Sequence, residues 1–362
     1  MMSFPHREKA GVLPFFLMYR DGAAQAQLNV AFVRAFTVVG TAFLVAATCL
    51  VLTAIGVSVP KVSWPKNSPV SQGHATTPTA KSNAYATATQ ACGTQLASDS
   101  LFASCPSFTA NFVTQHNGSL SDRFFNIYSG KPEANGEAQL YTANQQNVRV
   151  ENGNLVLQAL SSPQQGYKYT SGRVDTKGKE DFLYGKLVVR ATIPSGIGTW
   201  PAVWMLPSQP KYATMSPAND PNGYLNDGEI DMAESVGTEP HVVYGIAHSR
   251  AYPEDGPDRS YYSTVRLLNN DTNFHDYEVD WTPTNLTFKV DSKVFFTISK
   301  KPGADYRSWP YDQPFYLVVN LALGGSWGGV DRKDFPIDGV NPASLPSALR
   351  LQFVKYYPYI GK

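Results

Sequence analysis

The sequence predicts an all-β domain, a sandwich of the jelly-roll kind, preceded by a single transmembrane helix. Short runs of β-branched and aromatic residues, separated by Gly, Pro and Asn, follow one another from residue 105 onward. No stretch of this region keeps the apolar stripe of a helix over three turns. Residues 35–59, by contrast, are apolar and uncharged over about the 20 residues that a helix needs to cross a bilayer.

The apolar run at 35–59 is predicted to be an uncleaved membrane anchor. It is longer than the roughly 7 to 15 apolar residues of a cleaved signal peptide, and it lies too far from the N-terminus. Arg20 and Arg34 precede it, and Lys61 and Lys66 follow it. Because positive charge is nearly balanced on the two sides, charge does not settle the orientation of the anchor.

Residues 60–104 are predicted to form a flexible stalk. The segment is rich in Ser, Thr, Ala, Pro and Gln and has no apolar periodicity. Of the three cysteines, Cys49 lies in the apolar run, which leaves Cys92 and Cys105 downstream. A disulfide between Cys92 and Cys105 is permitted outside the cytosol and would close a short loop at the entrance to the main domain, residues 105–362; two free thiols are the alternative.

The strands of the main domain are indicated by one hairpin and by several apolar runs. Asn152-Gly153 separates two short strand-like segments, and this dipeptide is the strongest short hairpin signal. Residues 286–291 alternate apolar and polar side chains. Further β-branched or aromatic runs lie at 185–193, 294–298, 315–323 and 351–357. Many short strands over about 250 residues favour one all-β sandwich.

Composition limits the classes of partner. The chain is 43% hydrophobic and 16% charged, as expected of a globular core with a lightly charged surface. A formal net charge of +1 provides no basic surface for nucleic acid, so a neutral polymer fits better. The 20 Tyr, 19 Phe and 6 Trp are typical of a β-protein whose groove stacks sugar rings, although most aromatic residues in any fold belong to the core.

Three carboxylates at Glu229, Asp231 and Glu234 are the strongest candidates for chemistry. Side chains two apart on a strand share a face, so Glu234 joins the other two only if a β-bulge inserts one extra residue. The Cα atoms of Glu229 and Glu234 would then lie roughly 13 Å apart, and their carboxyl groups about 5 Å apart, the spacing of a retaining glycosidase. The alternative is a solvated strand face. The apolar residues 200–206 nearby favour function, because like charges are costly in such surroundings unless paired or protonated.

The bulged E-x-D-x-x-E strand resembles the active-site strand of glycoside hydrolase family 16, in particular its laminarinase-like members that act on β-1,3-glucans. The resemblance extends over most of the main domain. It includes segments in the order of the family, at residues 147–155, 169–173, 198–207, 274–277, 280–283 and 320–325. It implies a concanavalin A-like jelly roll whose concave face binds sugar.

The resemblance also implies a role for each acid and a set of substrate-binding residues. Glu229 would be the nucleophile, Glu234 the general acid/base, and Asp231 the carboxylate that orients the nucleophile. Six further side chains match polar or aromatic positions of the cleft in similar enzymes: Arg173, Trp200, Trp204, His248, Asn320 and Trp327. For each of them the alternative is a core or rim position, and of the two neighbouring tryptophans we expect Trp200 to be the sugar platform.

Similar enzymes often hold a structural calcium ion on the convex face, between acidic residues of the first and last strands. The aligned positions here are Asn111 and Gln352, neither of which is a charged oxygen ligand. We therefore expect no metal ion and no cofactor.

The resemblance predicts an endo-glycosidase for β-1,3 or mixed β-1,3/1,4 glucan. A cell-wall transglycosylase and a galactan or agar hydrolase of the same fold are alternatives, and a non-catalytic glycan-binding module is a third. A polysaccharide hydrolase is useful outside the cytosol. We therefore expect residues 1–34 in the cytoplasm and the catalytic domain, a monomer, at the cell surface or in the extracellular space.

Overall fold

The computed structural model describes residues 101–216, 220, 223–251, 261–329 and 338–361. All of them belong to one compact unit, Ser82–Lys362. The predicted anchor, the predicted stalk up to residue 100, and Cys92 lie outside the described residues, whereas Cys105 is disulfide-bonded. Within the described residues no helix is long and apolar enough to cross a membrane.

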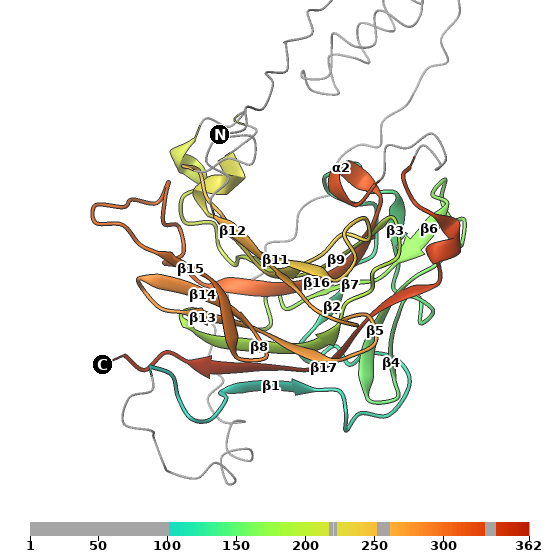
Figure 1. Cartoon of the computed structure of the whole chain (residues 1–362), viewed down its shortest axis with the longest axis horizontal. Coiled ribbons are helices and arrows are strands. Elements are labelled where there is room, and N and C mark those ends of the chain that lie inside the picture. Colours follow the sequence, from blue (N-terminus) through green and yellow to red (C-terminus); the bar gives the residue numbers. More distant parts are fainter. Residues whose placement is uncertain (1–100, 217–219, 221–222, 252–260, 330–337, 362) are drawn as a thin grey trace, which may run out of the picture. The chain divides into compact units, whose positions relative to one another are not determined.

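The described part is a sandwich of two large sheets, seen as two layers in Figure 1. All strand pairs within each large sheet are antiparallel. The eight-stranded sheet contains β1 (Phe108–Asn111), β4 (Val148–Glu151), β5 (Asn154–Ala159), β8 (Gly185–Thr192), β13 (His275–Trp281), β14 (Asn285–Val290), β15 (Lys293–Ser299) and β17 (Ser347–Pro358).

The seven-stranded sheet carries the predicted acids. It contains, in spatial order, β12 (Tyr262–Arg266), β11 (Val242–His248), β10 (Glu229–Glu234), β9 (Thr199–Pro207), β16 (Phe315–Leu323), β7 (Arg173–Asp175) and β2 (Asn126–Ile127). Within the described residues, a small parallel pair and four short helices complete the fold: β3 (Gln139–Tyr141), β6 (Tyr169–Ser171), α2 (Gly325–Gly328), η1 (Ala213–Met215), η2 (Gly223–Asn226) and η3 (Pro342–Ser344).

The core lies between the two sheets and follows the period of two expected of half-buried strands. In β14 every second side chain is buried, at Leu286, Phe288 and Val290. These residues join a single large apolar cluster with side chains from both sheets, such as Val189 and Val203. The prediction of an all-β sandwich is therefore confirmed.

The predicted hairpin is confirmed by the backbone of its turn. Asn152 and Gly153 join β4 to β5 with φ values of 50° and 74°. Positive φ at both central residues is the requirement of a type I′ turn, which Asn-Gly meets at little cost. The strands predicted at 185–193, 286–291 and 315–323 are also confirmed, with ends that differ by one residue at most.

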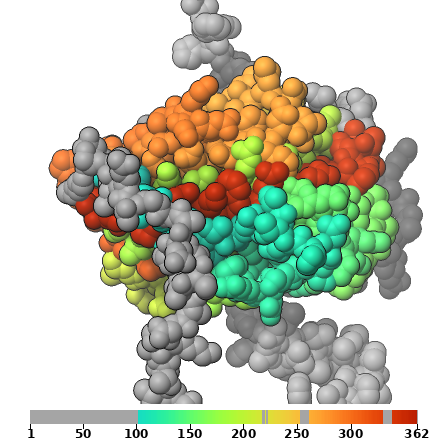
Figure 2. All heavy atoms as spheres, turned by 90° about the horizontal axis from the view of Figure 1, so that it is seen from below, coloured from blue at the N-terminus to red at the C-terminus, as the bar shows by residue number. Residues whose placement is uncertain are grey.

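The described chain enters and leaves the sandwich on the eight-stranded sheet. β1 pairs with β17, and Phe102 forms a β-bridge with Tyr359. Figure 2 looks onto this side of the molecule, where the first described residues and the last strand lie next to each other. The acids of β10 are on the other sheet.

Asn111 and Gln352, the positions at which the resemblance would place a structural calcium ion, do not fit a metal ion. Asn111 Oδ1 accepts the backbone N–H of Val113 at 3.0 Å. Gln352 Oε1 accepts a hydrogen bond from Arg190 Nε at 3.0 Å, and the same guanidinium pairs with Asp276 at 2.8 Å. Protein donors and a fixed positive charge therefore already satisfy the oxygens that calcium would need.

Candidate active site

A glycine sets the start of the acid-bearing strand. Gly228, with φ of 76°, turns the chain into β10 directly before Glu229. A Cβ at this position would lie 2.6 Å from Pro310 Cγ. The close approach and the left-handed backbone together require glycine, and they fix where Glu229 leaves the loop.

The predicted β-bulge is confirmed within β10. Against β9, Asp231 pairs with Trp204 and Ala233 pairs with Val203, so Met232 is the extra residue. The pairing with β11 is shifted by one residue at the same place. Met232 and Ala233 are fully buried in the core, and the bulge returns Glu234 to the face of the other two acids. We call this outward side of the seven-stranded sheet the acid-bearing face.

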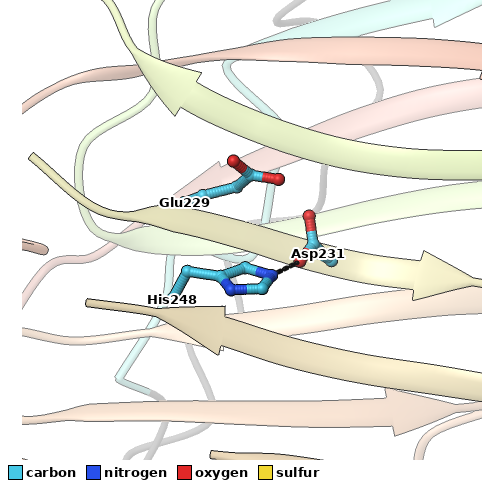
Figure 3. A group of neighbouring side chains, drawn as sticks. All are labelled: Glu229, Asp231 and His248. Atoms are coloured by element: carbon cyan, nitrogen blue, oxygen red, sulfur yellow. Dashed lines mark ion pairs between the residues drawn. The ribbon is translucent and has the colours of Figure 1, made fainter. Parts of the chain in front are cut away.

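Glu229, Asp231 and His248 form a compact group, shown in Figure 3. The two carboxyl groups lie on the same side of β10, and His248 reaches across from β11, with Nε2 at 2.9 Å from Asp231 Oδ2. One potential ligand atom from each residue lies within 4.8 Å of the others, so the group could hold a cation. His248 Nε2 and Asp231 Oδ2, two of the three potential ligand atoms, already contact each other directly. We therefore assign no metal ion to this group.

Glu234 is held in surroundings that favour its protonated form. Burial raises the pKa of its carboxyl well above the usual range, and the charge of Asp231 raises it further. Trp200 Nε1 donates a hydrogen bond to Oε1 at 2.6 Å, which acts in the opposite direction. The net result is a carboxyl group that keeps its proton to higher pH, as a proton donor requires.

Trp200 and Trp327 pack together beside Glu234. The Trp200 side chain is nearly covered, with 9% of its surface exposed, and its ring meets Trp327 edge to face at 5.6 Å. Gly328 of α2 lies so close that a Cβ would be 2.8 Å from Trp200 Cβ. The structure therefore places Trp200 where its N–H contacts an acid, while Trp327 is partly exposed and also meets Tyr244 at 4.9 Å.

Three other predicted residues meet on the neighbouring strands. Trp204 on β9 is partly exposed and lies opposite Asp231 in register. Its Nε1 donates to Asn320 Oδ1 at 2.7 Å, and the guanidinium of Arg173 lies 5.6 Å from the centre of its ring. Arg173 also contacts Glu133 at 3.2 Å. The structure thus gathers the predicted binding residues around the acids, with Trp204 the more exposed of the two neighbouring tryptophans.

Sequence reasoning missed Glu137 and its partner Tyr141. Glu137 precedes β3, and its carboxylate accepts hydrogen bonds from Tyr141 Oη at 3.1 Å and from Gln139 Nε2 at 2.6 Å. Burial raises the pKa of Glu137, and these donors oppose the shift. No motif marks this residue, which is a single Glu after Asn-Gly in a loop.

Comparison with known proteins gives consistent matches. The family model described as Glycosyl hydrolases family 16 matches residues 135–334. A beta-glucanase of Rhodothermus marinus is 38% identical over 259 residues, which are 66% of this chain and 84% of that protein. The glucan endo-1,3-beta-glucosidase A1 of Niallia circulans is 30% identical over 236 residues, 62% of this chain and 32% of that protein.

A solved structure agrees with the sequence matches. The X-ray structure of the laminarinase from Rhodothermus marinus is similar with a TM-score of 0.62 and 35% sequence identity. The match covers 71% of this chain and 98% of that one.

Proposed function

The chain belongs to glycosyl hydrolases family 16, and we propose that it is a retaining endo-glycosidase that cleaves internal β-1,3 or mixed β-1,3/1,4 glucosidic bonds. One observation supports the mechanism: the bulge in β10 brings three carboxyl groups to one face of the strand. Burial and the charge of Asp231 raise the pKa of one of them, Glu234, which favours its protonated form. The names of the similar proteins support a β-glucan as substrate.

In the first half-reaction Glu229 attacks the anomeric carbon while Glu234 gives its proton to the leaving glycosidic oxygen. The bond between the anomeric carbon and that oxygen breaks, and a glycosyl-enzyme ester forms on Glu229. Asp231, held by His248, lies beside Glu229 and keeps it oriented.

In the second half-reaction Glu234 must act as a base toward water. The charge of Glu229 is one of the contributions that raise the pKa of Glu234. That charge disappears when Glu229 becomes an ester, so the pKa of Glu234 falls when its carboxylate form is needed. Water attacks the anomeric carbon, its proton goes to Glu234, and Glu229 is released.

The proposal is tested by Glu229→Gln and Glu234→Gln in the full-length chain. We expect each variant to lose release of reducing ends from laminarin, with the β-sheet circular dichroism unchanged. Hydrolysis at the wild-type rate in either variant would contradict the catalytic role that we propose for the substituted glutamate. An NMR spectrum of the first product distinguishes retention from inversion at the anomeric carbon.

A panel of substrates tests the linkage. We expect laminarin and mixed-linkage β-glucan to be cleaved to short oligosaccharides, and agar and carrageenan to be left intact. Products longer than the starting oligosaccharide would show transglycosylation instead. Binding of laminarin without any cleavage would favour a glycan-binding module.

We also propose that residues 35–59 anchor the chain, with residues 60–104 as a stalk and the catalytic domain on the extracellular side. The support is the uncharged apolar run and the Ser/Thr/Pro-rich segment that follows it. Extraction of membranes with carbonate, followed by protease treatment of intact cells, tests this proposal. Release by carbonate, or a catalytic domain protected from protease, would contradict it.

A further inference from the structure

An unbroken series of hydrogen bonds leads from Trp204 on the acid-bearing face to Glu137, which precedes β3. Trp204 Nε1 donates to Asn320 Oδ1 at 2.7 Å, and Asn320 Nδ2 donates to Tyr141 Oη at 3.1 Å. Tyr141 Oη donates to Glu137 Oε2 at 3.1 Å. Tyr141 and Asn320 are buried, with 2% and 7% of their surfaces exposed, so water does not compete for their bonds.

The donor and the acceptor of every hydrogen bond in this series follow from which atoms can donate and which can only accept. An indole nitrogen can only donate, so Asn320 must present its oxygen to Trp204 and its nitrogen to Tyr141. Tyr141 then accepts from Asn320 and has one proton left to donate. A carboxylate can only accept, and Glu137 therefore ends the chain.

Gln139 supports the same oxygen of Glu137. Its Nε2 donates to Glu137 Oε2 at 2.6 Å, while its Oε1 accepts the backbone N–H of Leu323 at 2.7 Å. Leu323 ends β16, the strand that carries Asn320. Glu137 itself forms a β-bridge with Gly324, which follows Leu323 and is the N-cap of α2. The carboxylate is therefore tied to the sheet through two independent paths.

We propose that Glu137 is a positioning residue for substrate binding, which holds the Trp204 ring in one orientation beside the acids through Tyr141 and Asn320. The proposal rests on the function proposed above and assigns the Trp204 ring as a stacking surface for a glucose unit. Arg173 lies at the ring from the β7 side and limits its movement further. Glu137 touches neither the acids nor the reacting bond; it acts through the ring.

The test compares Glu137→Ala, Glu137→Gln and Tyr141→Phe in the full-length chain, with laminarihexaose as substrate. We expect Glu137→Ala and Tyr141→Phe, each of which breaks the series of hydrogen bonds that ends at Glu137, to raise KM by about five- to tenfold, with kcat changed by less than about threefold. The hydrogen bonds from Gln139 and Tyr141 both end on the same oxygen of Glu137, Oε2, so one amide oxygen can accept both of them. Glu137→Gln should therefore restore KM to within about threefold of the wild type.

A double-mutant cycle separates positioning from general loss of stability. Glu137 reaches Trp204 only through Tyr141 and Asn320 in this series of hydrogen bonds. The double variant Glu137→Ala/Tyr141→Phe should therefore raise KM no more than either single substitution. Glu151→Ala is the matched control: it removes a surface glutamate, paired with Arg149 on the eight-stranded sheet, and should leave KM unchanged.

The outcomes are distinct. Unchanged KM in Glu137→Ala, additive effects in the double variant, or a defect in Glu137→Gln as large as in Glu137→Ala would each overturn the positioning role. Calorimetry in a Glu229→Gln background measures the affinity of the same Glu137 and Tyr141 variants for laminarihexaose without hydrolysis of the ligand. A wild-type chain that neither binds nor cleaves laminarihexaose would instead refute the proposed function.

Discussion

Glu234 shows how function and stability oppose each other at a single residue. Its carboxyl group is buried beside Asp231, and both burial and the neighbouring charge raise its pKa. The folded protein therefore prefers Glu234 neutral, whereas the unfolded chain ionises it near the ordinary value of 4.5. The side chain that we propose as the proton donor is thus a source of instability at neutral pH.

Glu234→Gln should stabilise the protein while it abolishes hydrolysis. Below the pKa that Glu234 has in the unfolded chain, its carboxyl group is protonated in both the folded and the unfolded state. Its ionisation then does not change the free energy of unfolding. As pH rises toward the raised folded pKa, the unfolded state loses its proton first and wild-type stability falls. Glutamine cannot ionise, so the melting temperature of Glu234→Gln should exceed that of the wild type at pH 7 and match it most closely at pH 4.

Scanning calorimetry at both pH values checks this, with Glu151→Gln as the control. Arg149 lowers the pKa of the exposed Glu151, so its substitution should produce a small effect of the opposite sign. An equal melting temperature for Glu234→Gln and the wild type at pH 7 would contradict the prediction.

Trp200→Phe should move the alkaline limb of the kcat profile to higher pH. The indole N–H donates to Glu234 and favours the carboxylate form, so its loss raises the pKa of Glu234. Catalysis needs Glu234 protonated, and activity is lost as pH rises through that pKa. Trp204→Phe is the comparison: it removes an indole that donates to Asn320, and should change KM without moving the limb.

At the scale of a single element, the bulge in β10 decides whether there is an active site at all. Without the extra residue, Glu234 would point into the core, since side chains alternate along a strand. Deletion of Met232 should therefore lower kcat by about 10²- to 10⁴-fold, the range of a lost general acid/base. Met232→Leu, which changes the core side chain but keeps the bulge, should retain most of the activity.

Circular dichroism and kinetics of the two Met232 variants test this prediction. Retained sheet structure with lost activity in the deletion alone is the expected pattern. If the deletion variant hydrolyses laminarin as well as Met232→Leu, the geometric role of the bulge is wrong.

The sequence could predict those elements whose pattern lies within a few neighbouring residues. The Asn152-Gly153 turn and the period-two stretches depend on neighbours in sequence, and the acids of β10 need only one extra residue to share a face. Trp200 and Trp204 share a face only if the strand between them is regular, and Pro201 lacks a backbone N–H for the ladder. β9 nevertheless runs through Pro201 as one strand, so Trp200 and Trp204 do lie on one face.

The side-chain partners within the site could not be predicted in this way. The bond from Asn320 to Tyr141 joins residues 179 apart in the chain, and that from Trp200 to Glu234 joins residues 34 apart. Both depend on strand order and on which rotamers fit after packing. Sequence patterns therefore selected candidate residues on the acid-bearing face, but they did not indicate that Trp200 contacts Glu234 or that Glu137 ends a series of hydrogen bonds.

For the molecule as a whole, stability should not depend on a metal ion. Where the resembled family often binds calcium, this chain has Arg190 between Gln352 and Asp276, and Asn111 accepts a backbone N–H. Removal of metals with EDTA should therefore shift the melting temperature by less than about 1 °C. A larger fall, reversed by added calcium, would contradict this prediction.

The pairing of β1 with β17 brings the two ends of the folded domain together on the sheet opposite the acids. Because its ends lie close together, such a domain can be fused to other sequences at either end or inserted into a loop of another protein. In neither case does a linker need to cross the acid-bearing face. The same arrangement makes the domain a natural starting point for circular permutation, with new ends opened at the Asn152-Gly153 turn.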